Sequence, residues 1–288
     1  MCRERDFGFA RISLHMAAHC HHFGKSSYAA KSSLKYRPPK VGYNTCTDMN
    51  PASSAENKLT LMSIPFTRVD GKGISLNDLV ISNFKKSPSP ASADQIWLWV
   101  DKGDGVWGYE EWFLNNNAKW MRTTSVSTSF DSEYKDGLPS GTAFWYRSYK
   151  DNNPRTLTTS GAVDSDVKVE PTIICNEYNF VSFPYPVALK LNDETMADWS
   201  NSKKSPSPAS ADQIMLWVDK GGGVWGYEEW FLNNSRKWMR TTSVSTSFES
   251  VHPNGVVVGT GFWYLARSQT GKTSFTITFK SPLEKTAE

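Results

Sequence analysis

A stretch of 46 residues occurs twice in this chain. Residues 85–130 read KKSPSPASADQIWLWVDKGDGVWGYEEWFLNNNAKWMRTTSVSTSF, and residues 203–248 repeat this text with four changes, so 46 minus 4, or 42, positions are identical. The changed pairs are Trp97/Met215, Asp104/Gly222, Asn117/Ser235 and Ala118/Arg236. Since nearly identical segments have the same local preferences, the repeat predicts two units of one architecture in tandem.

The similarity continues on both sides of the identical block and marks the limits of each unit. Upstream, LTLMSIPF (59–66) corresponds to YNFVSFPY (178–185), and downstream GTAFWYRS (141–148) corresponds to GTGFWYLARS (259–268). Each unit is therefore roughly 100 residues long, an ordinary domain size. We predict a disordered N-terminal tail over residues 1–57, a first β-repeat domain over 58–160, a linker over 161–176 and a second β-repeat domain over 177–282.

The local pattern within each unit is that of short antiparallel strands. QIWLWVD, VWGYEEWFL and TAFWYRS are rich in aromatic and β-branched residues and are separated by Gly, Asn, Asp and Pro. DKGDG after Val100 is typical of a hairpin turn. Only ISLNDLVISNF (74–84) suggests a short helix, capped by Ser75 or Asn77. The sequence predicts an all-β protein of two antiparallel β-sandwich or barrel-like domains, each with at most one short helix.

Composition excludes several partner classes. Of the 32 Lys and Arg, 8 lie in residues 1–57 with 4 of the 29 Asp and Glu, which leaves 24 basic and 25 acidic residues in the rest. Because residues 58–288 are nearly neutral and contain no basic cluster, the composition argues against nucleic-acid binding. No apolar run approaches the ~18 residues of a membrane span. The N-terminal segment lacks the apolar core of a signal peptide. We expect the protein to be a monomer.

Cysteine and histidine use favours neither a disulfide scaffold nor a metal site. The repeated block contains no cysteine. In the tail, the spacing of His15 and His19 would let them share a helix face and chelate a metal together with Cys20, His21 and His22. The surrounding segment is rich in Ser and Lys and has no second ligand pair, so a disordered tail is the favoured interpretation. We predict no metal and no cofactor.

The order of these motifs resembles a known repeat. LMSIPF, ASADQIWLWV, a Trp/Tyr-rich hairpin, KW, FWYR after a glycine and LTTSGAV follow one another. This order is similar to a "VSFP…AD.I..W…GFW" β-repeat of predicted surface or secreted proteins of Verrucomicrobia, Lentisphaerae and Planctomycetes. The second copy departs from it where Leu265 and Ala266 precede Arg267. The resemblance implies a tandem, non-catalytic module that is extracellular or at the cell surface, and it implies no ligand.

Enzymatic chemistry has weak support in the sequence. Glu110 and Glu111 look like a glycosidase pair, which needs two carboxyl groups ~5 Å apart in a retaining enzyme. Neighbouring residues of a strand point to opposite faces, so these two cannot converge on one bond. Asp101 and Asp104 could bind calcium, but the second copy reads DKGGG and loses one carboxylate. We therefore predict a polar turn and no catalysis.

Tryptophan and tyrosine supply the candidate binding residues. Alternation places Trp107, Tyr109 and Glu111 on one face of a strand. One interpretation makes Trp107, Trp112, Trp120 and Trp145 core residues. The other makes the first face a stacking platform for a sugar ring. The corresponding candidates in the second copy are Trp225, Tyr227 and Glu229.

The repetition itself bears on function. A binding or packing unit gains avidity from repetition, whereas a catalytic site seldom does. We therefore expect a non-enzymatic structural or adhesive surface protein. The alternative is a carbohydrate-binding module whose partner is a polysaccharide or another component of the cell surface.

Overall fold

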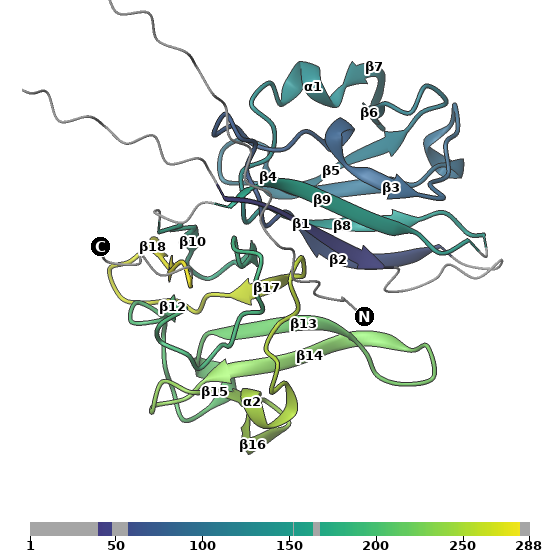
Figure 1. Ribbon diagram of the computed structural model, residues 1–288. Helices are drawn as coiled ribbons and strands as arrows, with labels where there is room; N and C mark the ends of the chain where they lie inside the picture. The colour runs from purple at the N-terminus through teal and green to yellow at the C-terminus, as the bar shows by residue number, and fades with distance from the viewer. Residues whose placement is uncertain (1–39, 48–56, 152, 164–167, 283–288) are drawn as a thin grey trace, which may run out of the picture. The chain divides into compact units, whose positions relative to one another are not determined.

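The computed structural model describes residues 40–47, 57–151, 153–163 and 168–282 (Figure 1). The strands of the first repeat are β1 (Lys40–Thr47), β2 (Lys58–Ser63), β3 (Val80–Ser82), β4 (Gln95–Asp101), β5 (Trp107–Leu114), β6 (Trp120–Arg122), β7 (Ser125–Ser129), β8 (Ala143–Ser148) and β9 (Thr156–Val163). Those of the second are β10 (Thr172–Ile174), β11 (Tyr178–Ser182), β12 (Ala197–Asp198), β13 (Gln213–Asp219), β14 (Trp225–Leu232), β15 (Trp238–Arg240), β16 (Ser243–Ser247), β17 (Gly261–Leu265), β18 (Ser274–Thr276) and β19 (Thr278–Phe279). The all-β class is confirmed.

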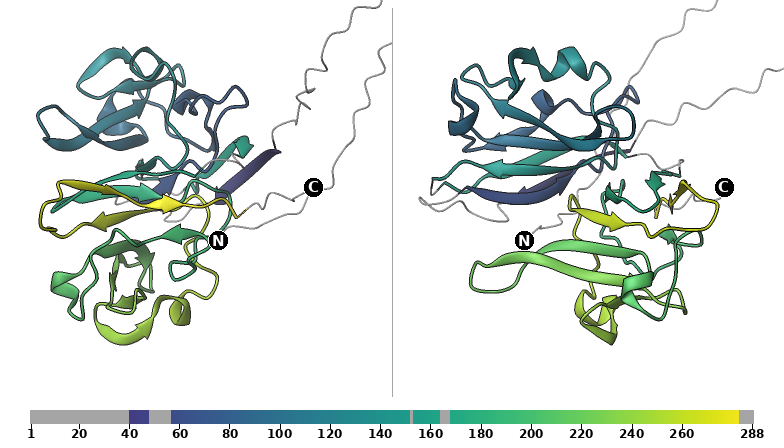
Figure 2. Two further views of the ribbon diagram at one scale, coloured as in Figure 1. Left: turned by 90° about the vertical axis from the view of Figure 1, so that its left-hand side faces the viewer. Right: turned by 180° about the vertical axis from the view of Figure 1, so that it is seen from behind.

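Each repeat is built on a six-stranded antiparallel sheet with the same strand order. The order is β2-β8-β4-β5-β6-β7 in the first repeat and β11-β17-β13-β14-β15-β16 in the second. The central hairpins β4–β5 and β13–β14 pair over seven residues each, with the same register. Figure 2 shows that β13 and β14 form a long hairpin whose turn extends past the neighbouring strands. Identical text therefore folds into identical hairpins.

Short helices complete each repeat. In the part of the chain that the structure describes, the α-helices are α1 (Phe130–Glu133) and α2 (Phe248–Val251), which follow β7 and β16 directly (Figure 1). Among the described residues the 3₁₀ helices are η1 (Leu76–Asp78), η2 (Pro90–Ser92) and η3 (Pro208–Ser210). The helix expected over residues 74–84 is thus a single 3₁₀ turn, capped by the Ser75 side chain, and the chain continues as strand β3. The β-branched Val80 and Ile81 favour that change to extended backbone.

Each repeat has its own hydrophobic core on one face of its sheet. In the first repeat the alternate residues Ile96 and Leu98 of β4 and Trp112 and Leu114 of β5 are buried there. The second repeat buries the equivalent positions, together with Trp199 and Trp238. Period-2 alternation thus decides which side chains enter the core.

Smaller sheets complete the repeats and move the expected domain limits. β1 and β3 both pair with β9 in a three-stranded sheet, β10 pairs with β18, and β12 pairs with β19. Residues 40–47 therefore form a strand inside the segment expected to be a disordered tail; the remaining tail residues lie outside the described residues. The end of β9 and all of β10 fall inside the expected linker. Strand pairing with distant partners, which local composition does not report, extends both repeats.

The outer faces of the two six-stranded sheets contact each other. Both repeats belong to one compact unit of the chain. The register places Trp97, Trp99 and Trp145 on the face of the first sheet opposite to its core. Met215, Trp263 and Leu265 of the second sheet form a buried cluster against which Trp99 packs. This contact explains why each sheet carries apolar side chains on its outer face as well as on its core face.

Candidate functional site

Glu110 is the most buried acidic side chain of the β4–β5 hairpin. It lies on the core face of β5, where Tyr134, just after α1, donates to its Oε1 at 2.9 Å. Trp112 Nε1 donates to the same oxygen at 3.0 Å, and Arg122 of β6 forms an ion pair with Oε2. Burial, followed by the hydrogen bond to Glu110, raises the pKa of Tyr134 above its usual value. Both carboxylate oxygens of Glu110 are therefore engaged in holding α1, β5 and β6 together.

The second repeat buries Glu228 at the same place with a different partner. Trp230 Nε1 donates to Glu228 Oε1 at 3.0 Å, and Arg240 pairs with Oε2, as in the first repeat. His252 replaces the tyrosine, and its Nε2 lies 2.5 Å from Oε1. Burial alone would raise the pKa of Glu228, but His252 and then Arg240 hold it below its usual range.

A second carboxylate is also buried at equivalent positions of the two repeats, with different partners. Asp94 is fully buried, and its two oxygens accept from Arg155, 3.1 Å from Nη2 to Oδ1 and 3.2 Å from Nε to Oδ2. Tyr146 adds a hydrogen bond of 2.7 Å. Its equivalent Asp212 accepts from Tyr264 and from backbone N–H groups, and burial raises its pKa. In both repeats the most buried carboxylates connect elements of the fold.

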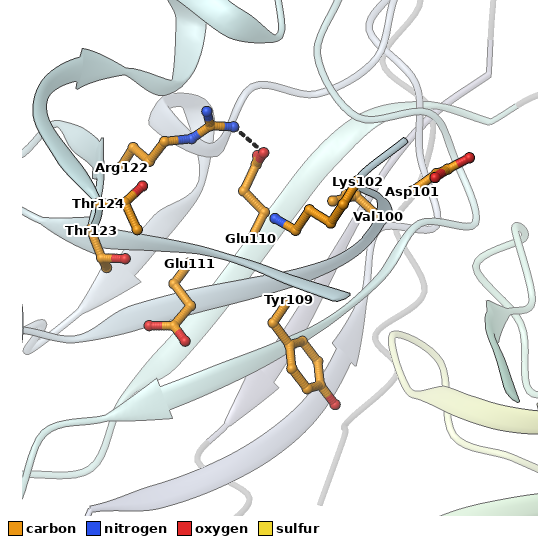
Figure 3. Close-up of a pocket in the computed structure, with 9 residues that line it drawn as sticks. All are labelled: Val100, Asp101, Lys102, Tyr109, Glu110, Glu111, Arg122, Thr123 and Thr124. Carbon is orange, nitrogen blue, oxygen red and sulfur yellow. Dashed lines mark hydrogen bonds and ion pairs between the residues drawn. The ribbon is translucent and has the colours of Figure 1, made fainter. Parts of the chain in front are cut away.

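A pocket of about 410 Å³ lies along the edge of β5 (Figure 3). β6 pairs with β5 over Trp112–Leu114, and Thr123 N–H donates to Glu111 O at 2.9 Å, so the strand pairing stops where the pocket begins. Because the pocket follows a strand edge, side chains of both strand faces line it. They are Val100, Asp101, Lys102, Tyr109, Glu110, Glu111, Arg122, Thr123 and Thr124.

Two of the predicted binding residues meet in this pocket. Figure 3 shows Tyr109 and Glu111 on one side of β5 and Glu110, directed toward Arg122, on the other. This confirms that the two consecutive glutamates point to opposite faces. Tyr109 is 38% exposed, and its ring packs edge-on against Trp99 with centroids 4.9 Å apart. Burial raises the pKa of Tyr109 above its usual value.

Trp107 does not line this pocket with Tyr109. It is 37% exposed and lines a smaller cavity of about 80 Å³, whose wall includes Trp99, Tyr178 and Phe180. The flat platform of Trp107, Tyr109 and Glu111 is therefore divided between two hollows.

The same strand of the second repeat keeps these exposure classes with small changes. Trp225 is half-buried, whereas Tyr227 and Glu229 are exposed. Burial raises the pKa of Tyr227, as it does for Tyr109. The equivalent aromatic groups are therefore available at the surface in both copies.

The other tryptophans divide between core and sheet contact. Trp112 and Trp120 are buried in the first core, as the core interpretation predicts. Trp145 is buried too, but on the outer face, where it lies edge-on to Trp217 of the other repeat. Trp97, whose counterpart in the second repeat is Met215, is half-buried on that same face and donates to Gln95.

Sequence reasoning missed the cationic and hydroxyl side chains of the pocket. Lys102, Arg122, Thr123 and Thr124 reach it from the hairpin turn and from the end of β6. The signal that could have found them is the shortness of β6: WMR is followed at once by TT and a second strand, so most of β5 has no partner on that side. An incompletely paired strand next to polar residues indicates a surface hollow.

The turn considered for calcium has ordinary hairpin geometry. Asp101 Oδ1 accepts the Gly103 N–H at 2.8 Å, and Asp104 has a positive φ of 53°, which Gly222 matches with 63°. Within the described ranges no group of three or more His, Cys, Asp or Glu side chains could hold a metal ion. The His15 to His22 cluster lies outside those ranges.

Comparisons add no family to this picture. No family model, no curated protein and no solved structure matches the chain. Among the residues described, no helix is long and apolar enough to cross a membrane.

Proposed function

We propose that this chain is a non-enzymatic surface or secreted tandem-repeat protein with a structural or adhesive role. The proposal rests on the buried glutamates, which have the same arrangement of hydrogen-bond and ion-pair partners in both repeats. Glu110 and Glu228 are each enclosed by an indole, an arginine and an aromatic or imidazole partner. Such groups stabilise two units rather than attack a substrate.

The exposed hairpins support an adhesive role. Val106 is 62% exposed and Val224 63% exposed, each directly before the aromatic strand of its repeat. Tyr109 and Tyr227 follow at 38% and 40% exposure. Two like hairpins on one chain can engage a repetitive surface together, which raises the apparent affinity without new contacts.

Carbohydrate binding is the second candidate, favoured by the pocket beside β5. A tyrosine ring can pack on the apolar face of a pyranose, while Glu111 accepts and Lys102 and Arg122 donate hydrogen bonds to hydroxyl groups. The pocket's volume of about 410 Å³ is within the ~300–1,000 Å³ of small-ligand sites. The same residue types recur in the second copy as Tyr227 and Glu229.

Binding of the full chain to immobilised polysaccharides tests the carbohydrate proposal. Tyr109→Ala should weaken binding, by up to ~10² where both copies engage one surface, and Tyr109→Phe should retain most of it because the ring remains. Tyr178→Ala is the matched control, because Tyr178 is an exposed aromatic residue outside this pocket. Equal losses for the Tyr178 and Tyr109 variants, or no binding to any polysaccharide, would reject the carbohydrate site.

The adhesive proposal has a separate test. Protease treatment of intact cells of the source organism should cleave the protein if it lies at the surface, and the culture medium should contain it if it is secreted. Protection of the whole protein pool inside intact cells would overturn the surface or secreted assignment.

A further inference from the structure

The contact between the two outer sheet faces obeys an approximate two-fold relation. Trp99 meets Trp263 with ring centroids 5.3 Å apart at 85°, and Trp145 meets Trp217 at 5.5 Å and 88°. Trp99 and Trp217 are equivalent positions of the repeats, as are Trp145 and Trp263. Exchanging the repeats therefore converts one contact into the other, which is the property of an isologous interface.

At one position the two equivalent residues of the repeats lie directly opposite each other, and this position marks the pseudo-two-fold axis. Ala143 begins β8 and Gly261 begins β17, at the same place in the two sheets. A Cβ added at Gly261 would lie 2.7 Å from Ala143 Cβ and 3.1 Å from Met62 O. Next to this pair, Ser63 N–H donates to Gly259 O at 2.8 Å. The sheets therefore approach too closely here for a methyl group on each side.

We infer that the outer sheet face of the first repeat is a recognition surface for a repeat with glycine at the axis, and that Ala143 excludes the pairing of two first repeats. An alanine opposite an alanine would force the backbones apart, because the obstructing atoms at this site are a β-carbon and a main-chain oxygen. The occupant of the first repeat's aromatic face is therefore a glycine-bearing repeat. Two first repeats from different chains cannot form this contact.

The contact departs from exact two-fold symmetry at further positions. Trp217 Nε1 donates to Leu59 O at 3.2 Å, whereas the Nε1 of Trp99 is buried with no hydrogen-bond partner among the described residues. Phe180 stacks on Trp263 with centroids 4.3 Å apart, where the first repeat has Leu61. The inference is independent of the proposed function, since it concerns how the repeats pair and not what they bind.

Substitutions at the axis in the full chain test the inference. Gly261→Ala should lower the thermal midpoint by roughly 5 °C, the shift expected from adding a methyl group to a closed contact. Ala143→Gly should change it by less than about 2 °C. The exchange A143G/G261A places one methyl group at the axis again, so it should recover at least half of the loss, with Met62 O limiting full recovery.

Gly226→Ala is the matched control, because an added Cβ there meets only the flexible Lys220 side chain, at 3.5 Å. It should leave the thermal midpoint within about 2 °C of the parent. If Gly261→Ala yields no folded protein, the yield of the exchange variant decides: recovery of folded protein supports the inference that the axis holds one methyl group but not two. A Gly261→Ala protein as stable as the control, or an exchange variant no better than Gly261→Ala, would overturn the inference.

Discussion

The two repeats bury the same glutamate and differ in one of its three partners. Glu110 and Glu228, with their indole and arginine partners, lie inside the identical 46-residue block. The remaining partner lies four residues beyond the end of the block, and it is Tyr134 in one repeat and His252 in the other. The identical sequence thus fixes the position of the charged carboxylate, and the flanking segment determines whether its third partner is a tyrosine or a histidine.

The buried aspartates show the same division more strongly. Both aspartates accept a backbone N–H at 2.7 Å, from Tyr149 in the first repeat and from Arg267 in the second. Asp94 also receives a buried guanidinium from Arg155, which lies beyond the block, whereas Asp212 has no such side chain among the described contacts. Burial consequently raises the pKa of Asp212. For an acid with a raised pKa, folding stability falls as pH rises from the unfolded value, about 3.9, through the folded value.

Arg155→Met should have the largest effect of the changes that separate the repeats. It would leave the Asp94 carboxylate buried without a cation, which costs about 3–5 kcal/mol in comparable cases. Urea unfolding of the full chain measures this loss. In the second repeat, Arg267→Met keeps the backbone N–H that contacts Asp212, so it should cost about 1 kcal/mol or less.

A second variant separates the charge effect from lost packing. Asp94→Asn combined with Arg155→Met removes the isolated charge and should recover part of the stability. Similar losses for Arg155→Met and Arg267→Met would mean that the aspartates are not held differently and would remove the contrast between the repeats.

His252→Tyr gives the second repeat the partner of the first and should have a smaller, pH-dependent effect. A lowered pKa means that Glu228 contributes stability above its unfolded pKa, about 4.3, and that this contribution is lost as pH falls through the folded value. Without the imidazole the folded-state pKa of Glu228 rises, so the loss should be complete at a higher pH, and stability near pH 6 should fall by about 1 kcal/mol. Unfolding curves from pH 3 to pH 7 measure both.

The reciprocal change Tyr134→His is the control for that experiment. It places an imidazole beside Glu110 and should move the acid loss of stability toward lower pH, opposite to the effect of His252→Tyr. If both variants shift the acid limb in the same direction, the identity of the partner does not set the pH response.

Much of the fold follows from local sequence, and the errors have one cause. Alternation in VWGYEEWFL correctly separates the buried Glu110 and Trp112 from the exposed Trp107 and Tyr109. It cannot say that the second face of the sheet is covered by another repeat, which is why Trp145 is buried outside the core. Local sequence does not predict strand β1 for a similar reason, since its partner β9 lies more than 100 residues away.

The candidate site was accessible to sequence reasoning only in part. Alternation predicts that Tyr109 and Glu111 are neighbours, because they lie on one face of a strand. Their separation from Trp107 depends on how the hairpin meets Tyr178 and Phe180, residues about 70 positions away. Long-range packing of this kind leaves no periodic signal in either segment.

The smallest expected effect concerns the hairpin turn, where the repeats differ by Asp104 and Gly222. Both residues have a left-handed backbone, with φ of 53° and 63°. In the folded state this conformation costs aspartate more free energy than glycine. Glycine, however, loses more conformational entropy on folding, because its unfolded chain is less restricted. These terms oppose each other, so Asp104→Gly should change the free energy of unfolding by no more than about 0.5 kcal/mol. Gly222→Asp should give a change of similar size and opposite sign.

Calcium sharpens this last comparison. As a polar turn, DKGDG should respond to the substitution equally with and without added calcium, and the thermal midpoint of the parent should not rise with calcium concentration. A calcium-dependent rise that disappears in Asp104→Gly would assign a metal site to the first repeat. Because the second repeat has glycine at this position, that result would also make the turn, and not only the flanking segments, a place where the repeats have diverged in chemistry.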